Sequence, residues 1–424
     1  MLNFLLLPSK KKILKPLTAK VHQLIKEFLP PLSSLDNYDF TAIENNIKLR
    51  KTTGDLELIK SLLKKLQNAD EGEKERLMLE LKSELWKLPN QTHADCLNYK
   101  NEPKEIAQFN KMPNEEVIKT KEFSEIAKKM RILRTEHLGN FTGHKSYYLI
   151  DSLAEIEHAL IRFATNYLKS KNFNIISVPD VLPSHIIEGC GMQTVGKRTQ
   201  VYRLNSLEKC LSGTSEMALA GYFKDKILKE EDLPIKLASV SRCFRAETSG
   251  LQEEKGIYRV HQFTKVEMFS VCSKDQSDNI LNLFKNIQIE LFAKLGIHFK
   301  LLDMPPSELG APAYRKYDIE AWLPGRKIWG EISSCSNCTD YQAKRLGIHY
   351  KRKDNTLEYV HTVNGTACAV PRLLIALLET HQNKEGSVQI PKELQIYLNK
   401  NEICKNLKVP ELKLVKQIDW PNTS

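Results

Sequence analysis

An arginine and a glutamate stand two residues apart at the end of a candidate strand, as Arg245 and Glu247 in the segment 242–269. Residues two apart lie on the same face of a strand. After the polar loop 248–256, a second candidate strand carries Phe263 among charged residues on one face, with Glu267 further along it. At about 3.3 Å per residue, these two side chains are roughly 13 Å apart. The spacing suits a ligand with an aromatic ring at one end and a cation at the other, and a solvent-facing amphipathic hairpin is the alternative.

Three further segments carry polar groups in patterns typical of binding sites. Thr214 and Glu216 precede a candidate helix, where they either face a pocket or cap the helix. Glu331 follows a candidate strand and precedes hydroxyl residues that include Ser334, and such hard oxygen ligands suit Mg²⁺. Arg372 lies at the start of an apolar helix. The helix dipole favours anions there, so this guanidinium has little use within the helix and is suited to bind phosphate.

The elements that must position these residues are strands separated by long insertions. The residue patterns predict strands at 173–178, 236–244, 256–269, 298–302, 316–322 and 329–334, and helices at 152–169, 276–295 and 369–380. Regular βαβ units are missing from this order, as are P-loop and GxGxxG motifs. The pattern therefore favours an α+β fold over residues 141–424, in which helices flank an antiparallel sheet.

The residues before this domain divide into three segments. Residues 1–30 contain six lysines among leucines and no acidic residue before Glu27, which is typical of an organelle transit peptide; a disordered basic tail is the alternative. Residues 31–95 are predicted to form an arm, a short antiparallel helical hairpin with heptad spacing on both sides of a turn at 68–72. Residues 96–140 would link the arm to the sheet. The lysines of the hairpin form either a solvated face or a surface for a nucleic acid backbone, and they are Lys60, Lys64, Lys65, Lys74, Lys82 and Lys87.

Composition limits the classes of partner. The net charge of +11, from 63 basic and 52 acidic residues, and the pI of about 9.0 favour polyanionic partners. No apolar run reaches the length of a membrane helix, so we expect no membrane partner. The nine cysteines are irregularly spaced, which indicates reduced thiols. Cys335 and Cys338 form a CxxC pair but lack the second pair that a structural zinc site requires.

Four of these segments, in their order along the chain, resemble motifs of the class II aminoacyl-tRNA synthetases. The hairpin FRAET…GIYRVHQFTKVEMF is similar to motif 2 of that class, and NGTACAVPRLLIALLE is similar to motif 3. GTSE, RVHQFTKVE and GEISSCSN resemble the seryl-tRNA synthetase family, while EGCGM and PAYRKYDIEAWLPGR resemble its mitochondrial branch. The resemblance covers roughly residues 36–398. It implies a class II catalytic domain with a short N-terminal coiled-coil arm.

The resemblance also implies an activity and its partners. L-Serine would be activated with ATP and Mg²⁺ to seryl-adenylate and then transferred to tRNA(Ser). The location would be the mitochondrial matrix, with the cytoplasm as the alternative. The family implies a homodimer, in which the arm of one subunit grips the tRNA bound to the other.

Residue roles follow from the same resemblance. Arg245 is matched to the α-phosphate, Arg372 to the γ-phosphate and Phe263 to adenine, and Glu331 and Ser334 are matched to Mg²⁺. The full ATP set is Arg245, Ala246, Glu247, Val260, Phe263, Glu331, Ile332, Ser333, Ser334 and Arg372, with Arg245, Glu331 and Arg372 as its catalytic members. The serine set is Thr214, Ser215, Glu216, Glu267, Asn364 and Thr366.

A synthetase-like paralogue without charging activity, which serves as a binding or assembly protein, is the alternative to the enzyme. Such a paralogue is expected to have lost at least one key residue, yet all five are present: Arg245, Glu247, Glu267, Glu331 and Arg372. The enzyme is therefore favoured. The main departure from the family is the arm, which is clearly shorter than the family coiled coil and leaves tRNA binding as the open question.

Overall fold

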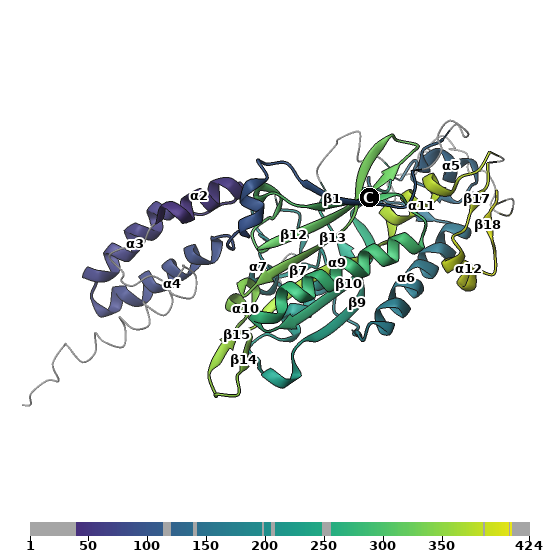
Figure 1. Ribbon diagram of the computed structural model, residues 1–424. Coiled ribbons are helices and arrows are strands. Elements are labelled where there is room, and N and C mark those ends of the chain that lie inside the picture. The colour runs from purple at the N-terminus through teal and green to yellow at the C-terminus, as the bar shows by residue number, and fades with distance from the viewer. Residues whose placement is uncertain are drawn as a thin grey trace, which may run out of the picture.

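The computed structural model describes residues 40–112, 120–138, 142–196, 199–204, 208–247, 256–384, 386–406 and 408, and the predicted transit peptide lies outside them. The strands of its main sheet are β1 (Lys104–Phe109), β4 (Asn174–Ile175), β9 (Ile235–Phe244), β10 (Gln262–Cys272), β11 (Phe299–Asp303), β12 (Arg315–Leu323), β13 (Ile328–Thr339) and β16 (His361–Ala369). They form one eight-stranded sheet in the order β1-β11-β12-β13-β16-β10-β9-β4. All neighbours are antiparallel except β4 and β9. The predicted α+β fold with an antiparallel sheet is confirmed (Figure 1).

Helices cover both faces of this sheet. On one face, α6 (Ser152–Ser170), α9 (Ser277–Lys294) and α11 (Val370–His381) contribute to the main hydrophobic core. On the other face, the shorter helices α7 (Ser184–Gly189), α8 (Ser215–Tyr222) and α10 (Tyr341–Leu346) form a second core. Successive residues of β10 point to opposite faces, so Met268 lies in the first core and Phe269 in the second. Both faces of β10 are therefore buried.

The remaining elements are small. The minor strands are β2 (Leu133–Arg134), β3 (Tyr148–Leu149), β5 (Val181–Pro183), β6 (Arg203–Leu204), β7 (Lys209–Leu211), β8 (Ile227–Lys229), β14 (His349–Lys351), β15 (Leu357–Tyr359), β17 (Val388–Gln389) and β18 (Glu402–Ile403). The remaining helices of this part of the chain are α5 (Phe123–Lys129) and α12 (Lys392–Leu398). No helix of the described residues combines the length and the hydropathy needed to cross a membrane.

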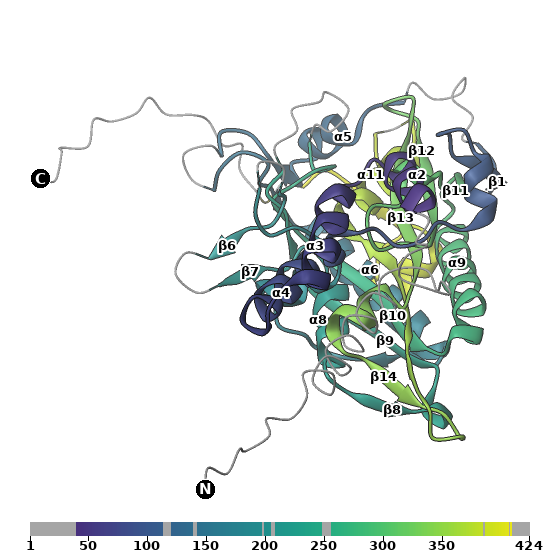
Figure 2. The ribbon, with the colours of Figure 1, turned by 90° about the vertical axis from the view of Figure 1, so that its left-hand side faces the viewer.

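The arm comprises α2 (Phe40–Arg50), α3 (Leu56–Asn68) and α4 (Glu71–Lys87). Asp55 and Asp70 cap α3 and α4 by accepting backbone N–H bonds of 2.9 Å at their N-termini. The apolar seam between α3 and α4 is formed by Leu56, Ile59, Leu62, Leu66, Leu77, Leu81, Leu85 and Leu88. Figure 1 shows this hairpin extending away from the main sheet, and in Figure 2 it lies in front of the sheet, toward the viewer. The structure contains a helical hairpin at these residues, with Leu62 and Leu77 in the seam and the neighbouring Leu63 and Met78 only partly buried against it.

Two strand predictions differ from the structure. The strand expected at 256–269 begins only at Gln262, because residues 256–259 form turns. The central strand β16 was not predicted at all. β16 is buried on both faces, so its sequence lacks the alternation of hydrophobic and polar residues that identifies a half-buried strand. The sequence HTVNGTACA also lacks the continuous aliphatic run that identifies a fully buried one. The segment 96–140, expected to be a linker, contributes the edge strand β1, which pairs with β11.

Candidate functional site

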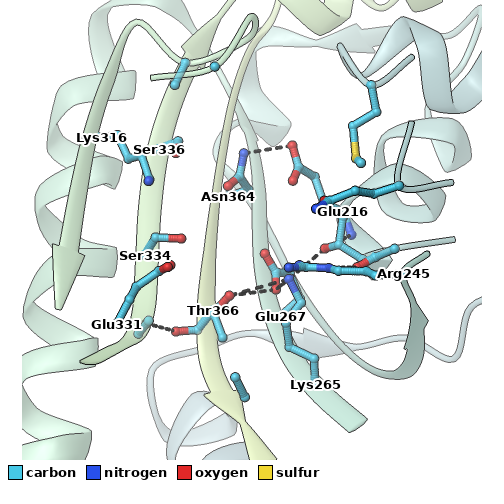
Figure 3. A pocket seen from close by; sticks show the side chains of 18 of the residues that line it. Glu216, Arg245, Lys265, Glu267, Lys316, Glu331, Ser334, Ser336, Asn364 and Thr366 are labelled. Atoms are coloured by element: carbon cyan, nitrogen blue, oxygen red, sulfur yellow. Dashed lines mark hydrogen bonds and ion pairs between the residues drawn. The ribbon is translucent and has the colours of Figure 1, made fainter. Parts of the chain in front are cut away.

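A cavity of about 510 Å³ lies on the face of the sheet opposite α6 and α9 (Figure 3). Fourteen of the sixteen site residues predicted from the sequence line it, namely Thr214, Glu216, Arg245, Glu247, Val260, Phe263, Glu267, Glu331, Ile332, Ser333, Ser334, Asn364, Thr366 and Arg372. The other two, Ser215 and Ala246, are not among the lining residues. Ser215 is buried in the first turn of α8, and Ala246 donates its backbone N–H to the carbonyl of Gln200.

A β-bulge in β13 brings Glu331 and Ser334, the two predicted Mg²⁺ ligands, to the same side of the strand. β13 carries an extra residue, Ile332, between the residues that pair with neighbouring positions of β12. A bulge bends the strand and redirects the side chains next to it. Glu331 and Ser334, three residues apart, therefore both point toward the cavity rather than to opposite faces (Figure 3).

Arg372, in the first turn of α11, fixes the carboxylate of Glu331. Its Nη1 donates to the carboxylate at 3.1 Å and to the backbone carbonyl of the same residue at 3.0 Å, while the guanidinium lies 4.6 Å from the ring centroid of Tyr258. Burial alone would raise the pKa of Glu331, but the positive charges of Arg372 and Lys316 outweigh it and hold the pKa at about 2. Glu331 is therefore ionised at neutral pH and remains available as a hard oxygen ligand.

Arg245 follows the last residue of β9 and lies against the aromatic ring predicted to bind adenine. Its guanidinium carbon is 5.3 Å from the centroid of Phe263, within the range of a cation–π contact. Glu247 is buried, 3.7 Å from the guanidinium of Arg259, and accepts a bond of 3.4 Å from Gln200. The ring of Phe263 and the guanidinium groups of Arg245 and Arg259 thus lie at one end of the cavity. They can receive a planar base and phosphates there.

Lys265 is the centre of a polar cluster at the other end. It forms an ion pair with Glu267 and donates to the hydroxyl of Thr214 at 2.8 Å. The hydroxyl of Thr366 donates to the carboxylate of Glu267 at 3.2 Å. The last contact crosses from β16 to β10, where Thr366 and Glu267 are direct partners in the ladder. The cluster joins a carboxylate, an ammonium and two hydroxyls in a buried site, which suits a small zwitterion with a hydroxyl group.

Glu216 is the second carboxylate at this end. Its Oε1 accepts hydrogen bonds from Gln342 at 2.7 Å and from Asn364 at 2.9 Å. Burial and the nearby charge of Glu267 raise the pKa of Glu216 to about 7. Thr214 combines the two functions that the sequence left as alternatives: it caps α8 by accepting the backbone N–H of Glu216 and also faces the cavity.

Several lining residues were missed at the sequence level. Lys265 could have been predicted from the sequence, because it lies between Phe263 and Glu267 on the same face of the predicted strand. Lys316 of β12 pairs with Asp318 at 2.9 Å and lies across the cavity from Glu216 (Figure 3). The segment 308–313 also lines the cavity. Pro312 and Ala313 begin the segment PAYRKYDIEAWLPGR, but no site role was predicted for them, and residues 308–311 belong to no motif.

Among the described residues, we consider Glu331 and Ser334 as the candidate site for a metal ion. The described part of the chain contains no group of three or more His, Cys, Asp or Glu side chains able to hold a metal. Glu331 and Ser334 offer one carboxylate and one hydroxyl. Mg²⁺ is often held in proteins by one or two carboxylates together with substrate phosphates, so these two residues fit a magnesium ion that arrives with a nucleotide.

Comparisons with known proteins agree with this geometry. The family model of the tRNA synthetase class II core domain (G, H, P, S and T) matches residues 200–381. The mitochondrial serine--tRNA ligase of Mus musculus is 44% identical over 76% of this chain, and the match spans 64% of that protein's own length. The serine--tRNA ligase of Dictyoglomus turgidum is 39% identical, over 82% of this chain and 80% of the relative.

Solved structures give the same result. The seryl-tRNA synthetase from Pyrococcus horikoshii, complexed with ATP, has a TM-score of 0.76 and 29% identity, over 93% of this chain and 92% of that one. The cytoplasmic serine-tRNA ligase from Naegleria fowleri, in complex with AMP, has a TM-score of 0.73 and 26% identity, over 93% and 90% of the two chains. The chain therefore belongs to the seryl-tRNA synthetase family of the class II aminoacyl-tRNA synthetases, and it resembles the mitochondrial members of that family.

Proposed function

We propose that this protein activates L-serine with ATP to form seryl-adenylate and then transfers the seryl group to tRNA(Ser) in the mitochondrial matrix. The observation that carries the proposal is the composition of one cavity, which has an aromatic ring and arginines at one end and a carboxylate–lysine–threonine cluster at the other. The first end suits a nucleotide. The second suits the ammonium and hydroxyl groups of serine.

The activation step needs positioning rather than a side-chain nucleophile. The serine carboxylate attacks the α-phosphorus in line, forms a mixed anhydride and releases pyrophosphate. Arg245 would hold the α-phosphate and Arg372 the γ-phosphate, so that two anions approach with their repulsion neutralised. Phe263 would stack on adenine and fix the direction of approach. Glu331 and Ser334 would hold Mg²⁺, which neutralises phosphate charge when bound.

Selection of serine would depend on the polar cluster. Glu216 and Glu267 would receive the α-ammonium group, and Thr366 with Asn364 would surround the hydroxyl. Glu267, Thr366 and Asn364 are buried, and Glu216 is partly buried. Alanine would leave these buried polar groups unpaired, which is why such pockets reject an analogue that lacks the hydroxyl.

The location and the assembly are inferred from similarity. The mitochondrial relatives support a mitochondrial location. The structural relatives with ATP and AMP support nucleotide binding here. The family resemblance supports a homodimer. The net charge of +11 favours a polyanionic partner, and we infer that the lysines of the arm contact the tRNA backbone.

Serine-dependent ATP–pyrophosphate exchange tests the activation step. We expect exchange that requires serine and Mg²⁺ in the wild-type protein and falls to background in Arg372→Ala. Arg352→Ala is the matched control, because it removes an exposed arginine that pairs with Glu358 outside the cavity. Its exchange should equal that of the wild type. A folded wild-type protein without exchange would overturn the proposal and favour a binding or assembly protein.

A further inference from the structure

One arginine of the arm is buried and bonded to the wall of the cavity. Arg50, the last residue of α2, is only 1% exposed. Its guanidinium donates to the carbonyls of Gly310 at 2.6 Å, Ala311 at 3.2 Å and Ala313 at 2.8 Å. It also donates to the carbonyl of Gln91 at 3.2 Å and to the hydroxyl of Thr92 at 3.1 Å. The segment 310–313, which we call the wall, lines the cavity.

This arginine is unusual in its partners. All five acceptors are neutral, and burial lowers the pKa of Arg50 to about 10, so the group remains charged at neutral pH. Burying a cation without a carboxylate is costly, and the planar fork of a guanidinium offers the geometry to bind several carbonyls at once. A lysine could not span the same acceptors. One side chain therefore holds three backbone carbonyls of the wall.

Asn90, three residues after the end of α4, holds the same wall from a second point. Its amide nitrogen donates to the carbonyls of Pro312 and Cys338, both at 2.8 Å, and to the hydroxyl of Thr339 at 2.9 Å. Its backbone N–H donates to the carbonyl of Ala311 at 2.9 Å. The arm is thus bonded to the wall at the end of its first helix and again just after its last helix.

The chain of contacts continues to the carboxylate predicted to bind serine. The thiol of Cys338, whose backbone carbonyl is held by Asn90, accepts a bond of 3.4 Å from the amide of Asn364. The same amide nitrogen donates to Glu216 at 2.9 Å. Cys338, Asn364, Glu216 and the wall all line the cavity. A shift at the root of the arm would therefore move the groups that orient Glu216.

We propose that Arg50 and Asn90 are positioning residues for the amino-acid end of the cavity. They act through the wall and through Cys338 and Asn364, and they set the affinity for serine without contacting it. None of the bonds of Arg50 and Asn90 given above reaches Arg245, Glu331 or Arg372, so we expect the nucleotide end to be affected far less. This inference rests on the proposed function, because the ligand at the affected end is taken to be serine.

The test compares Arg50→Lys and Asn90→Ala with the wild type in ATP–pyrophosphate exchange. We expect the KM for serine to rise about 10- to 100-fold, the range that follows a small misplacement of a binding group, while the KM for ATP stays within about twofold. Lys48→Met is the matched control, because it removes an exposed cation from the same helix. It should leave both constants unchanged.

The split between the two constants separates positioning from stability. If Arg50 and Asn90 only stabilised the fold, the variants would lose active protein, so the apparent kcat would fall with both KM values unchanged. That outcome would overturn the inference. A wild-type protein without any exchange would instead refute the proposed function, whereas normal exchange that is insensitive to both variants would refute only this inference.

Hydrogen exchange of the wild-type protein covers the case in which the variants do not fold. The backbone N–H groups of Asn90 and His93 donate to the carbonyls of Ala311 and Tyr314. Adding serine, ATP and Mg²⁺ should slow exchange in a peptide spanning residues 88–94 as well as in the cavity. Protection around Lys265 and Glu267 without any change at 88–94 would overturn the inference.

Discussion

Two carboxylates in one cavity bind their protons with very different strength. Glu331 lies against Arg372, and positive charge outweighs its burial, so its pKa is about 2. Glu216 has only neutral hydrogen-bond donors from Gln342 and Asn364, and burial raises its pKa to about 7. The nucleotide end therefore keeps one charge state across the physiological range. The amino-acid end changes its charge within that range.

This difference predicts a pH dependence for serine alone. Glu216 is protonated below about pH 7 and ionised above it, and only the ionised form attracts an ammonium group. We expect the KM for serine in the exchange assay to fall as the pH rises from 6 to 8, with a midpoint near 7. Glu216→Gln, which keeps an acceptor oxygen for Gln342 and Asn364, should have a higher KM that does not change over this range. Equal pH profiles in the two proteins would contradict the assignment of Glu216.

At the level of single residues, the sequence predicted fourteen of the residues that line the cavity, because its motifs contain the residue types that bind phosphates and ammonium groups. It missed Lys265, whose position between Phe263 and Glu267 was visible but whose partners come from α8 and β16. It also included Ser215, which lies inside α8 away from the cavity lining. Contacts between distant elements decide such cases, and a single sequence does not contain them.

At the level of elements, helix α9 is tied to the two strands that carry the candidate magnesium ligands and Thr366. Gln288 of α9 is fully buried and donates to the backbone carbonyls of Ser334 in β13 at 2.8 Å and of Thr366 in β16 at 2.9 Å. A single amide thus holds adjacent strands in register next to their bulges. The bulges themselves were not predictable, because an inserted residue such as Ile332 has no local signature.

Gln288→Leu should therefore destabilise the protein. The substitution preserves approximate volume but removes the Gln288 donor from the buried carbonyl of Ser334, which costs about 1–3 kcal/mol. The carbonyl of Thr366 still accepts from the hydroxyl of Ser333 at 2.6 Å. We therefore expect a fall of about 1–3 kcal/mol in the free energy of unfolding, measured by denaturant titration. Asn286→Leu, an exposed position on the same helix, is the control and should change stability by less than about 0.5 kcal/mol. Equal stability of the two variants would contradict the proposed importance of the Gln288 bonds.

At the level of the whole molecule, the arm and the cavity are separate surfaces, for which we propose separate ligands. The helical hairpin was predictable because its leucines repeat with helical spacing, yet the root of the arm was not, because Arg50 and Asn90 act on residues more than 200 positions away. The shortness of the arm limits the number of backbone contacts it can make with tRNA. Each lysine on it should therefore contribute noticeably to binding.

The exposed lysines Lys64, Lys65 and Lys82 of the arm provide the test. Replacing all three with Gln should lower kcat/KM for tRNA in aminoacylation and reduce the slope of log affinity against log salt by about 2 to 3, since each phosphate contact contributes about 0.7–0.9. ATP–pyrophosphate exchange should stay unchanged. The matched control replaces the exposed Lys351 and Lys353 of the sheet domain with Gln. A similar loss of tRNA affinity in that control would show that general charge, not the arm, determines binding.

The place of β16 in the sheet affects how the protein is made. β16 lies between β13 and β10, yet residues 273–360 separate it from β10 along the chain. On the ribosome, at about 5–20 residues per second, β10 is complete several seconds before its partner emerges, and its free edge is exposed meanwhile. An unpaired strand edge of this kind promotes aggregation. We therefore expect the nascent chain to need a chaperone until residue 369 has been synthesised, and a chain truncated before β16 to be insoluble rather than partly active.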